Sequence, residues 1–311
     1  MKYALVTGAT SGLGNEVAKT LSKNGWFVFA CGRNEDALKG LKNDYEYPIR
    51  MDVTNQESID AAYSQISALA DHLDAIINFS GVQEMASLIE GNTEIIERVL
   101  KVNLMGMVRV NKTFFPLVLK CRGRIINCSS ECGWMTPQPF NGPYTLSKYA
   151  VEAYNDSLRR ELMFLDIPVI KIQPGSFKTA MHEKTAQSFD KLIRDTKYYK
   201  NILTTMKAAM TFELKSANDP KYLVNAVIKA VSSPHPKQKY RVKNSKLLEF
   251  VETLHPVAVD SMYKKNHEIR KSFKNAAKNS IKNPACTIFV SRVYFNIILS
   301  FFKISFSFLE I

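Results

Sequence analysis

The chain has 311 residues, of which 46% are hydrophobic, and it carries a formal net charge of +13. This size and apolar content suffice for one large α/β domain with a buried core. The five cysteines form no even, closely spaced framework, and Cys128 and Cys132 have no histidine nearby, which argues against disulfides and a zinc site. The apolar run at residues 4–6 is too short for a signal peptide. We therefore expect a cytoplasmic protein with reduced thiols and no metal.

Short apolar runs alternate with amphipathic stretches up to about residue 242, a pattern typical of βαβ units. Strands are predicted at residues 3–6, 26–30, 49–51, 75–77, 124–128, 169–172 and 240–242. One helix is predicted to end at Asn24-Gly25, others to cover residues 35–41, 56–70, 94–115 and 144–164, and another to begin at Asp219-Pro220. The fold class is therefore α/β: a doubly wound parallel sheet of the Rossmann type. It forms a single domain, about residues 1–250.

Residues 180–216 interrupt this alternation with a charged stretch that contains scattered apolar residues such as Met181 and Met210. The stretch follows the carboxyl end of a predicted strand, where open α/β sheets bind their ligands. We interpret it as a substrate lid. An ordinary helical excursion packed on the sheet is an equally good interpretation.

The last part of the chain, about residues 251–311, is predicted to be a basic and then apolar C-terminal extension. Its basic positions are Lys264, Lys265, Arg270, Lys271, Lys274, Lys278 and Lys282. Only one aromatic residue, Phe273, lies among these basic positions, so a solvated basic segment is favoured and nucleic-acid binding is not expected. Charged residues interrupt the apolar part, so no uncharged run reaches the roughly 18 residues of a membrane span. A peripheral membrane contact, an oligomer contact and a poorly ordered tail stay open.

A glycine-rich turn, Thr7-Gly8-Ala9-Thr10-Ser11-Gly12-Leu13-Gly14, lies between the first predicted strand and the first predicted helix. Glycine permits a sharp turn and lets a pyrophosphate approach the helix N-terminus, whose free N–H groups and partial positive charge suit phosphate. The end of the second predicted strand reads Cys31-Gly32-Arg33-Asn34, with no carboxylate before Glu35. Arginine at this place accommodates a 2′-phosphate, so NADP is favoured and NAD is left as an alternative.

Tyr144 and Lys148 lie four residues apart in a predicted helix, so both side chains project from the same face. An ammonium beside a phenol favours the ionised phenol and lowers its pKa from the unperturbed value of about 10. Such a pair can donate a proton to a carbonyl oxygen or accept one from an alcohol. Together with the nucleotide turn, the pair predicts an oxidoreductase.

By these features the chain resembles the short-chain dehydrogenase/reductase family over about residues 1–245. The resemblance also rests on Asp52-Val53, on Asn78-Phe79-Ser80-Gly81, on Asn103, and on Pro174-Gly175 with Thr179. It implies that Asp52 and Val53 contact adenine, that Pro174, Gly175 and Thr179 hold the nicotinamide amide, and that a catalytic tetrad consists of Asn103, Ser130, Tyr144 and Lys148. The cofactor-binding residues it implies are Gly8, Thr10, Ser11, Gly12, Leu13, Gly14, Arg33, Asp52, Val53, Asn78, Ser80, Gly81, Tyr144, Lys148, Pro174, Gly175 and Thr179.

The resemblance implies the following roles. Tyr144 acts as general acid or base, Lys148 lowers its pKa and holds the ribose hydroxyls, and Ser130 polarises the substrate oxygen. Asn103 positions a water that leads from Lys148 to solvent. Ser130 lies fourteen positions before Tyr144, where the family more often has twelve or thirteen, so the loop between them must hold an extra residue.

The stretch from Tyr144 to Leu162 looks like the retinol and hydroxysteroid dehydrogenase subgroup, which implies a lipophilic alcohol or ketone as substrate. The loop at residues 134–140, with Trp134 and Phe140, is expected to line an apolar pocket together with Met181. We therefore expect an NADP-dependent enzyme. The alternatives are an NAD-dependent sterol or acyl-chain oxidoreductase and a non-catalytic NADP-binding protein recruited to a membrane. A homo-oligomer is expected from the resemblance alone.

Overall fold

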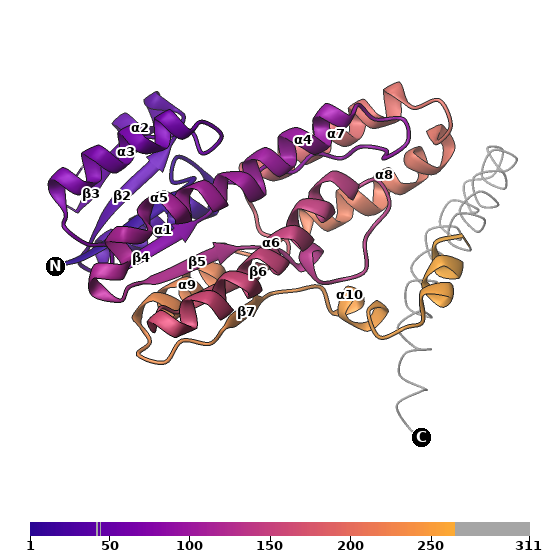
Figure 1. Ribbon diagram of the computed structural model, residues 1–311. Coiled ribbons are helices and arrows are strands. Elements are labelled where there is room, and N and C mark those ends of the chain that lie inside the picture. Colours follow the sequence, from indigo (N-terminus) through magenta and orange to yellow (C-terminus); the bar gives the residue numbers. More distant parts are fainter. Residues whose placement is uncertain (42, 44, 265–311) are drawn as a thin grey trace, which may run out of the picture. The chain divides into compact units, whose positions relative to one another are not determined.

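The computed structural model describes residues 1–264 except residues 42 and 44. A seven-stranded, fully parallel sheet has the order β3-β2-β1-β4-β5-β6-β7 (Figure 1). The strands are β1 (Lys2–Thr7), β2 (Trp26–Gly32), β3 (Glu46–Arg50), β4 (Ala75–Asn78), β5 (Arg124–Cys128), β6 (Val169–Pro174) and β7 (Lys239–Val242). Apolar side chains fill both faces of the central strands, as expected for a parallel sheet covered on both sides. The predicted fold class is confirmed.

Helices cover both faces of this sheet. One core cluster packs α1 (Gly12–Lys23) and α9 (Lys221–Ser232) against one face, with Leu38 of α2 (Glu35–Lys39) beside them. The other cluster packs α3 (Gln56–Leu69), α5 (Gly106–Cys121) and α6 (Gly142–Leu162) against the opposite face. This two-sided covering is the doubly wound arrangement that the sequence predicts.

The position of β1 determines where a ligand can bind. The chain builds outward from β1 through β2 to β3, then crosses back to β4 on the other side of β1. The connections therefore leave β1 and β4 in opposite directions and open a crevice at their carboxyl ends. The glycine turn after β1 and the segments after β2, β4, β5 and β6 all meet at this edge of the sheet.

The helix predicted at residues 94–115 is not continuous. The structure divides it into α4 (Thr93–Leu100), a wide π-helical turn (Lys101–Met105) and α5. Such turns insert one extra residue and are frequent at functional sites. At the start of α5 the backbone comes so close to Val53 that a Cβ on Gly106 would lie 2.7 Å from the Val53 Cγ2. The π turn carries Asn103.

The predicted lid region forms α7 (Ala180–Asp195) and α8 (Lys200–Lys215), and α10 (Lys246–Val251) follows β7. Residues 1–203 and 207–253 form one compact unit. Among the described residues, 204–206 and 254–264 belong to a second unit, in which 256–264 are helical. Of the extension predicted at residues 251–311, residues 251–264 are described, whereas its apolar part and all its predicted basic positions except Lys264 lie on residues 265–311, outside the described residues. No helix within residues 1–264 is both long and apolar enough to cross a bilayer.

Candidate active site

A cavity of about 540 Å³ lies at the carboxyl edge of the sheet. It brings together residues from the glycine turn, from the ends of five further strands (β2 to β6), and from α6, α7 and α8. The predicted cofactor and catalytic residues that line it are Gly8, Thr10, Ser11, Gly12, Leu13, Gly14, Arg33, Asp52, Val53, Ser80, Gly81, Ser130, Tyr144, Lys148, Pro174, Gly175 and Thr179. A nucleotide turn and a candidate acid–base pair therefore share one cavity.

The glycine turn fits a dinucleotide. Gly8 has a φ of +70°, and a Cβ there would lie 2.9 Å from the carbonyl carbon of Phe79. A Cβ on Gly14 would lie 2.5 Å from the Gly8 carbonyl oxygen, so only glycine lets α1 start this close to the turn. Ser11, the N-cap of α1, makes no side-chain capping hydrogen bond, which leaves the first N–H groups of the helix for another acceptor. This arrangement suits a phosphate.

Asp52 follows β3 at the adenine end of the expected cofactor site. Its Oδ1 accepts hydrogen bonds from the backbone N and the Oγ1 of Thr54, at 2.9 and 2.8 Å. Burial acts to raise the pKa of this carboxyl, but the Thr54 hydrogen bonds and the charges of Arg33 and Lys101 outweigh burial and lower the pKa. Asp52 is therefore an ionised acceptor, with Val53 beside it in the cavity wall.

The catalytic candidates come from two elements. Tyr144 and Lys148 lie on α6, and the Lys148 Nζ is 5.5 Å from the centre of the Tyr144 ring. Ser130 follows β5, and its Oγ accepts a hydrogen bond from the Cys132 backbone N at 3.2 Å. The Ser130 hydroxyl also lies close enough to Tyr144 to act on the pKa of the phenol, which it lowers. Despite the extra residue between them, the serine and the tyrosine therefore meet, because the chain takes up that residue in the turn at Glu131–Gly133 and in the following loop.

The titration behaviour of the pair differs from the prediction. Burial raises the pKa of Tyr144, the neighbouring Cys132 acts in the same direction, and the Ser130 hydrogen bond opposes them. Burial also lowers the pKa of Lys148. The Lys148 ammonium donates a hydrogen bond to the carbonyl oxygen of Cys128 at 2.9 Å. Desolvation is thus the largest influence on the phenol, and it outweighs the lowering of the Tyr144 pKa that was expected from Lys148.

Two predicted site residues do not line the cavity. The Asn103 amide is buried: its Oδ1 accepts from the Val82 backbone N at 2.8 Å, and its Nδ2 donates to the Val82 carbonyl and to Ser147 Oγ, each at 2.9 Å. It ties the strand-end loop to α6, so its side chain has little capacity left for the predicted water. Asn78, expected to contact the cofactor, is buried instead in the sheet interior.

Asn78 belongs to a buried amide cluster, which consists of Asn78, Asn111, Asn127, Tyr154 and Asn155. Its Nδ2 donates to Asn111 Oδ1 at 2.7 Å and to Asn127 Oδ1 at 3.0 Å. Asn111 Nδ2 also reaches the Tyr154 hydroxyl at 3.1 Å, and Asn127 Nδ2 reaches Asn155 Oδ1 at 3.1 Å. The cluster joins β4 and β5 to α5 and to α6, the helix that carries Tyr144. It therefore fixes the helix on the sheet.

Glu131, which lines the cavity next to Ser130, was missed by the sequence analysis. Its side chain is buried, and its Oε2 accepts a hydrogen bond from the Ser245 backbone N at 2.7 Å. Burial raises the pKa of this carboxyl to about 7, although the Ser245 hydrogen bond lowers it. The contact joins the turn after β5 to the N-cap of α10. The only sequence signal for Glu131 was its position directly after Ser130.

Glu131→Gln should remove a pH-dependent loss of stability. Because the folded protein holds this proton more tightly than the unfolded chain, stability falls as pH rises from about 4.5 to about 7. Above that range the ionised carboxylate costs about 3 kcal/mol, which glutamine does not pay. Urea unfolding of the two proteins should therefore give similar stabilities at low pH and a more stable variant at high pH. If the two proteins differed equally in stability at low and at high pH, the raised pKa of Glu131 would be contradicted. Glu94→Gln, an exposed change on α4, controls for the loss of a negative charge.

The far side of the cavity is formed by the predicted lid region. Met181, His182, Lys184 and Thr185 of α7, with Met210, Glu213 and Leu214 of α8, line it. Two hydrogen bonds hold α7 to the segment after β4: Thr185 Oγ1 to Gln83 Oε1 at 3.3 Å, and the Met85 backbone N to Ser188 Oγ at 3.2 Å. The expectation that Trp134 lines the pocket is wrong, because the Arg241 guanidinium lies 3.5 Å from its ring centre and covers it. Phe140 does not line it either, and its ring packs against Tyr199. Gln138 of this loop and Asn141, the N-cap of α6, reach the cavity instead.

A family model for short chain dehydrogenases matches residues 2–189. The chain belongs to the short-chain dehydrogenase/reductase family. The predicted resemblance is thereby confirmed, and the family gives the chemistry: an NAD(P)-dependent oxidoreductase that acts on CH–OH groups of small molecules.

Similar proteins include retinol dehydrogenase 7 of Mus musculus, which is 33% identical over 253 residues, covering 77% of this chain and 79% of its own length. The 17-beta-hydroxysteroid dehydrogenase type 6 of Homo sapiens is 33% identical over 258 residues, covering 77% of this chain and 80% of its own length. Among solved structures, an actinorhodin polyketide ketoreductase with NADPH superimposes with a TM-score of 0.65 at 25% identity, covering 77% of this chain and 95% of the other.

Proposed function

We propose that this protein is an NADP-dependent dehydrogenase/reductase that interconverts a lipophilic alcohol, of retinoid or steroid type, with the corresponding carbonyl compound. The observation that carries the proposal is that Ser130 and Tyr144 line the same cavity as the glycine turn. A hydroxyl pair placed there can hold a substrate oxygen and exchange its proton.

The preference for NADP rests on the end of β2. Arg33 lines the cavity with an exposed side chain, and its Nη1 lies 3.9 Å from Asp52 Oδ2. The first carboxylate after the strand, Glu35, is engaged elsewhere, because its Oε1 pairs with Arg50 Nε at 2.8 Å. Arg33 is therefore available to a 2′-phosphate, and no carboxylate takes the place that would select a free 2′-hydroxyl.

The bound nicotinamide would supply or accept the hydride. In the reductive direction Tyr144 donates its hydroxyl proton to the substrate oxygen as negative charge grows there, and in the oxidative direction it takes that proton back. Ser130 Oγ already accepts from the Cys132 N–H, so its own proton is free to be donated to the same oxygen. Lys148 would hold the ribose hydroxyls, and its charge would support the ionised phenol in the oxidative direction.

The substrate class is supported by the wall opposite the glycine turn. Met85, Phe177, Met181, Met210 and Leu214 give this part of the cavity an apolar lining. Flexible methionine side chains accommodate bulky apolar ligands of varied shape. The names of the two similar proteins, a retinol dehydrogenase and a hydroxysteroid dehydrogenase, support the same class. We further propose that α7 and α8 act as the substrate lid of a catalytic domain that extends to about residue 250.

The proposal is tested by initial rates for a panel of retinoid, steroid and small polar carbonyl compounds, each with NADPH and with NADH. We expect turnover of the lipophilic members, with a higher kcat/KM for NADPH. In Arg33→Asp the preference should shift toward NADH by about 10- to 100-fold, since a charged hydrogen-bond partner of the phosphate is lost. Lys39→Asp on α2, whose ammonium pairs with Asp36, is the matched control for the charge change.

Turnover restricted to small polar compounds would contradict the lipophilic substrate. A preference for NADH in the unchanged protein would favour the alternative NAD-dependent sterol or acyl-chain enzyme. Cofactor binding without turnover of any alcohol or ketone would favour a non-catalytic NADP-binding protein. A homo-oligomer in the cytoplasm is part of the proposal. A peripheral membrane contact through the C-terminal extension rests on residues outside the described part of the chain.

A further inference from the structure

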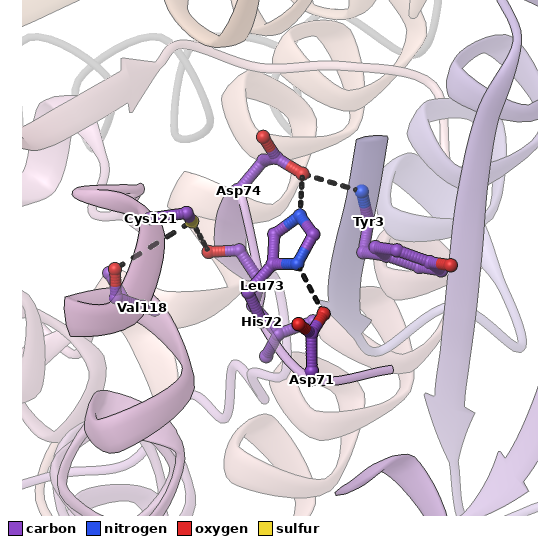
Figure 2. Close-up of polar contacts among 7 residues, drawn as sticks. All are labelled: Tyr3, Asp71, His72, Leu73, Asp74, Val118 and Cys121. Atoms are coloured by element: carbon purple, nitrogen blue, oxygen red, sulfur yellow. Dashed lines mark hydrogen bonds and ion pairs between the residues drawn. The ribbon is translucent and has the colours of Figure 1, made fainter. Parts of the chain in front are cut away.

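Three side chains that could bind a metal ion lie together at the edge of the sheet opposite the cavity. His72 and Asp74 immediately precede β4, and Cys121 is the last residue of α5. The side-chain donor atoms of these three residues lie within 4.8 Å of one another (Figure 2). The segments are held together by the backbone: the Leu73 N–H donates to the Leu117 carbonyl of α5 at 3.0 Å. The position of the three donors is therefore set by the sheet and by α5.

The distances suit a tetrahedral ion. Metal–nitrogen and metal–oxygen bonds of about 2.0–2.1 Å place two ligand atoms of a tetrahedron about 3.3 Å apart. His72 Nε2 lies 3.5 Å from Asp74 Oδ2, close to this value. The Cys121 Sγ now donates weak hydrogen bonds to the carbonyls of Leu73 and Val118, at 3.2 and 3.8 Å. Rotation of this one side chain would bring the sulfur toward the other two ligands.

Neighbouring residues orient His72 and Asp74, the two potential ligands that precede β4. The Asp71 Oδ1 lies 2.6 Å from His72 Nδ1, on the side of the ring away from Asp74, so the ring presents Nε2 to Asp74 (Figure 2). A carboxylate behind a ligating imidazole is the usual second partner in zinc sites. The Asp74 Oδ2 also accepts a hydrogen bond from the Tyr3 backbone N at 2.8 Å, which fixes the carboxylate. The His72 ring is further held edge-on to the Tyr3 ring, with centroids 5.2 Å apart.

We propose that His72, Asp74 and Cys121 bind a zinc ion, with water as the fourth ligand. A thiolate, an imidazole and a carboxylate together match the ligand preference of zinc and not that of magnesium or calcium. On binding, the thiol of Cys121 gives its proton to solvent and the sulfur bonds to the metal. His72 and Asp74 have partly exposed side chains, so the ion can enter from solvent.

The ion would join the start of β4 to the end of α5, far from the carboxyl edge where Tyr144 lies. Its expected effect is therefore on stability and not on turnover. A ligand that binds only the folded protein stabilises it in proportion to the logarithm of its free concentration. Zinc should consequently raise the Tm of the full-length protein while kcat stays unchanged.

The test is a zinc titration of the metal-free full-length chain against a chromophoric chelator, with Tm measured in parallel. We expect one site that is weakened at least about 100-fold in His72→Gln and in Cys121→Ser, with loss of the zinc-dependent rise in Tm. Asp71→Asn should weaken the same site by about 10- to 100-fold, as expected for a partner that orients a ligand. Cobalt titrated in place of zinc should show a thiolate charge-transfer band that Cys121→Ser abolishes.

The matched controls are His235→Gln and Asp36→Asn, which are exposed changes of the same types elsewhere in the chain. They should leave zinc affinity unchanged, and magnesium should not raise the Tm of any variant. Unchanged zinc affinity in both His72→Gln and Cys121→Ser would overturn the proposal, as would a cobalt band that survives Cys121→Ser. Carbonyl reduction by the variants shows that they are folded, since none of the changed residues lines the cavity.

Discussion

Tyr144→Phe should lower kcat by about 10²- to 10⁴-fold, because the variant lacks the hydroxyl that exchanges a proton with the substrate oxygen. The ring is buried on α6 and phenylalanine preserves its packing, so KM for the cofactor should change little. The loss should appear in both reaction directions, since the same group acts as acid in one and as base in the other. Single-turnover rates with saturating NADPH measure this step apart from product release.

The matched control is Tyr149→Phe, on the same helix one residue after Lys148. Its hydroxyl donates a hydrogen bond to the Met135 carbonyl at 2.8 Å and does not reach the cavity. This variant should keep its kcat. A Tyr144→Phe enzyme with full activity would exclude the proton-transfer role of Tyr144. The buried Glu131 carboxyl beside Ser130 would then be the alternative proton donor.

Gly14→Ala should produce the second large loss, this time in cofactor binding. The added Cβ would lie 2.5 Å from the carbonyl oxygen and 2.9 Å from the carbonyl carbon of Gly8. Both are backbone atoms, so the contact can be relieved only if α1 moves away from the turn. We expect a loss of about 1–3 kcal/mol in stability from overpacking and about a 10²-fold loss in kcat/KM for NADPH from the displaced phosphate site.

Gly40→Ala is the control, because the nearest atom to a Cβ at Gly40, the Ala37 carbonyl oxygen, would be 3.9 Å away. It should leave both stability and cofactor binding nearly unchanged. Calorimetric measurement of NADPH binding, made at a temperature where each variant is folded, separates the two effects. Gly14→Ala with unaltered NADPH affinity would show that this end of α1 does not hold the phosphates.

The sheet was largely predictable from the sequence, since β1, β2, β4, β5, β6 and β7 appear within two residues of their predicted ends. Buried parallel strands are short apolar runs, and their hydropathy marks them directly. The interruption of the predicted helix at residues 94–115 was not predictable, because a π turn does not alter the period of apolar residues enough to be seen. The turn leads directly into the close approach of Gly106 to Val53, a contact between distant parts of the chain.

The candidate site, like the fold, was predictable from the sequence only in part. Spacing alone predicted that Tyr144 and Lys148 share a helix face, and the pairing of Ser130 with Tyr144 was expected from the family resemblance. Spacing could not show that Asn78 turns into the sheet or that burial raises the pKa of Tyr144, because both depend on what packs around them. The proposed zinc ligands were missed for a similar reason. Cys121 lies 49 positions after His72 and 47 after Asp74, so no recognisable ligand spacing exists.

The amide cluster around Asn127 has a consequence for folding. Asn127 stands opposite Asn78 in the pairing of β5 with β4. If β5 slipped by one residue, the Asn127 amide would turn to the other face of the sheet, and Asn78, Asn111 and Asn155 would lose their hydrogen bonds to it in an apolar interior. The apolar residues of β4 and β5 would tolerate several strand registers. The asparagines destabilise the incorrect registers. The enzyme thus obtains a single alignment of its catalytic helix from side chains that never touch a substrate.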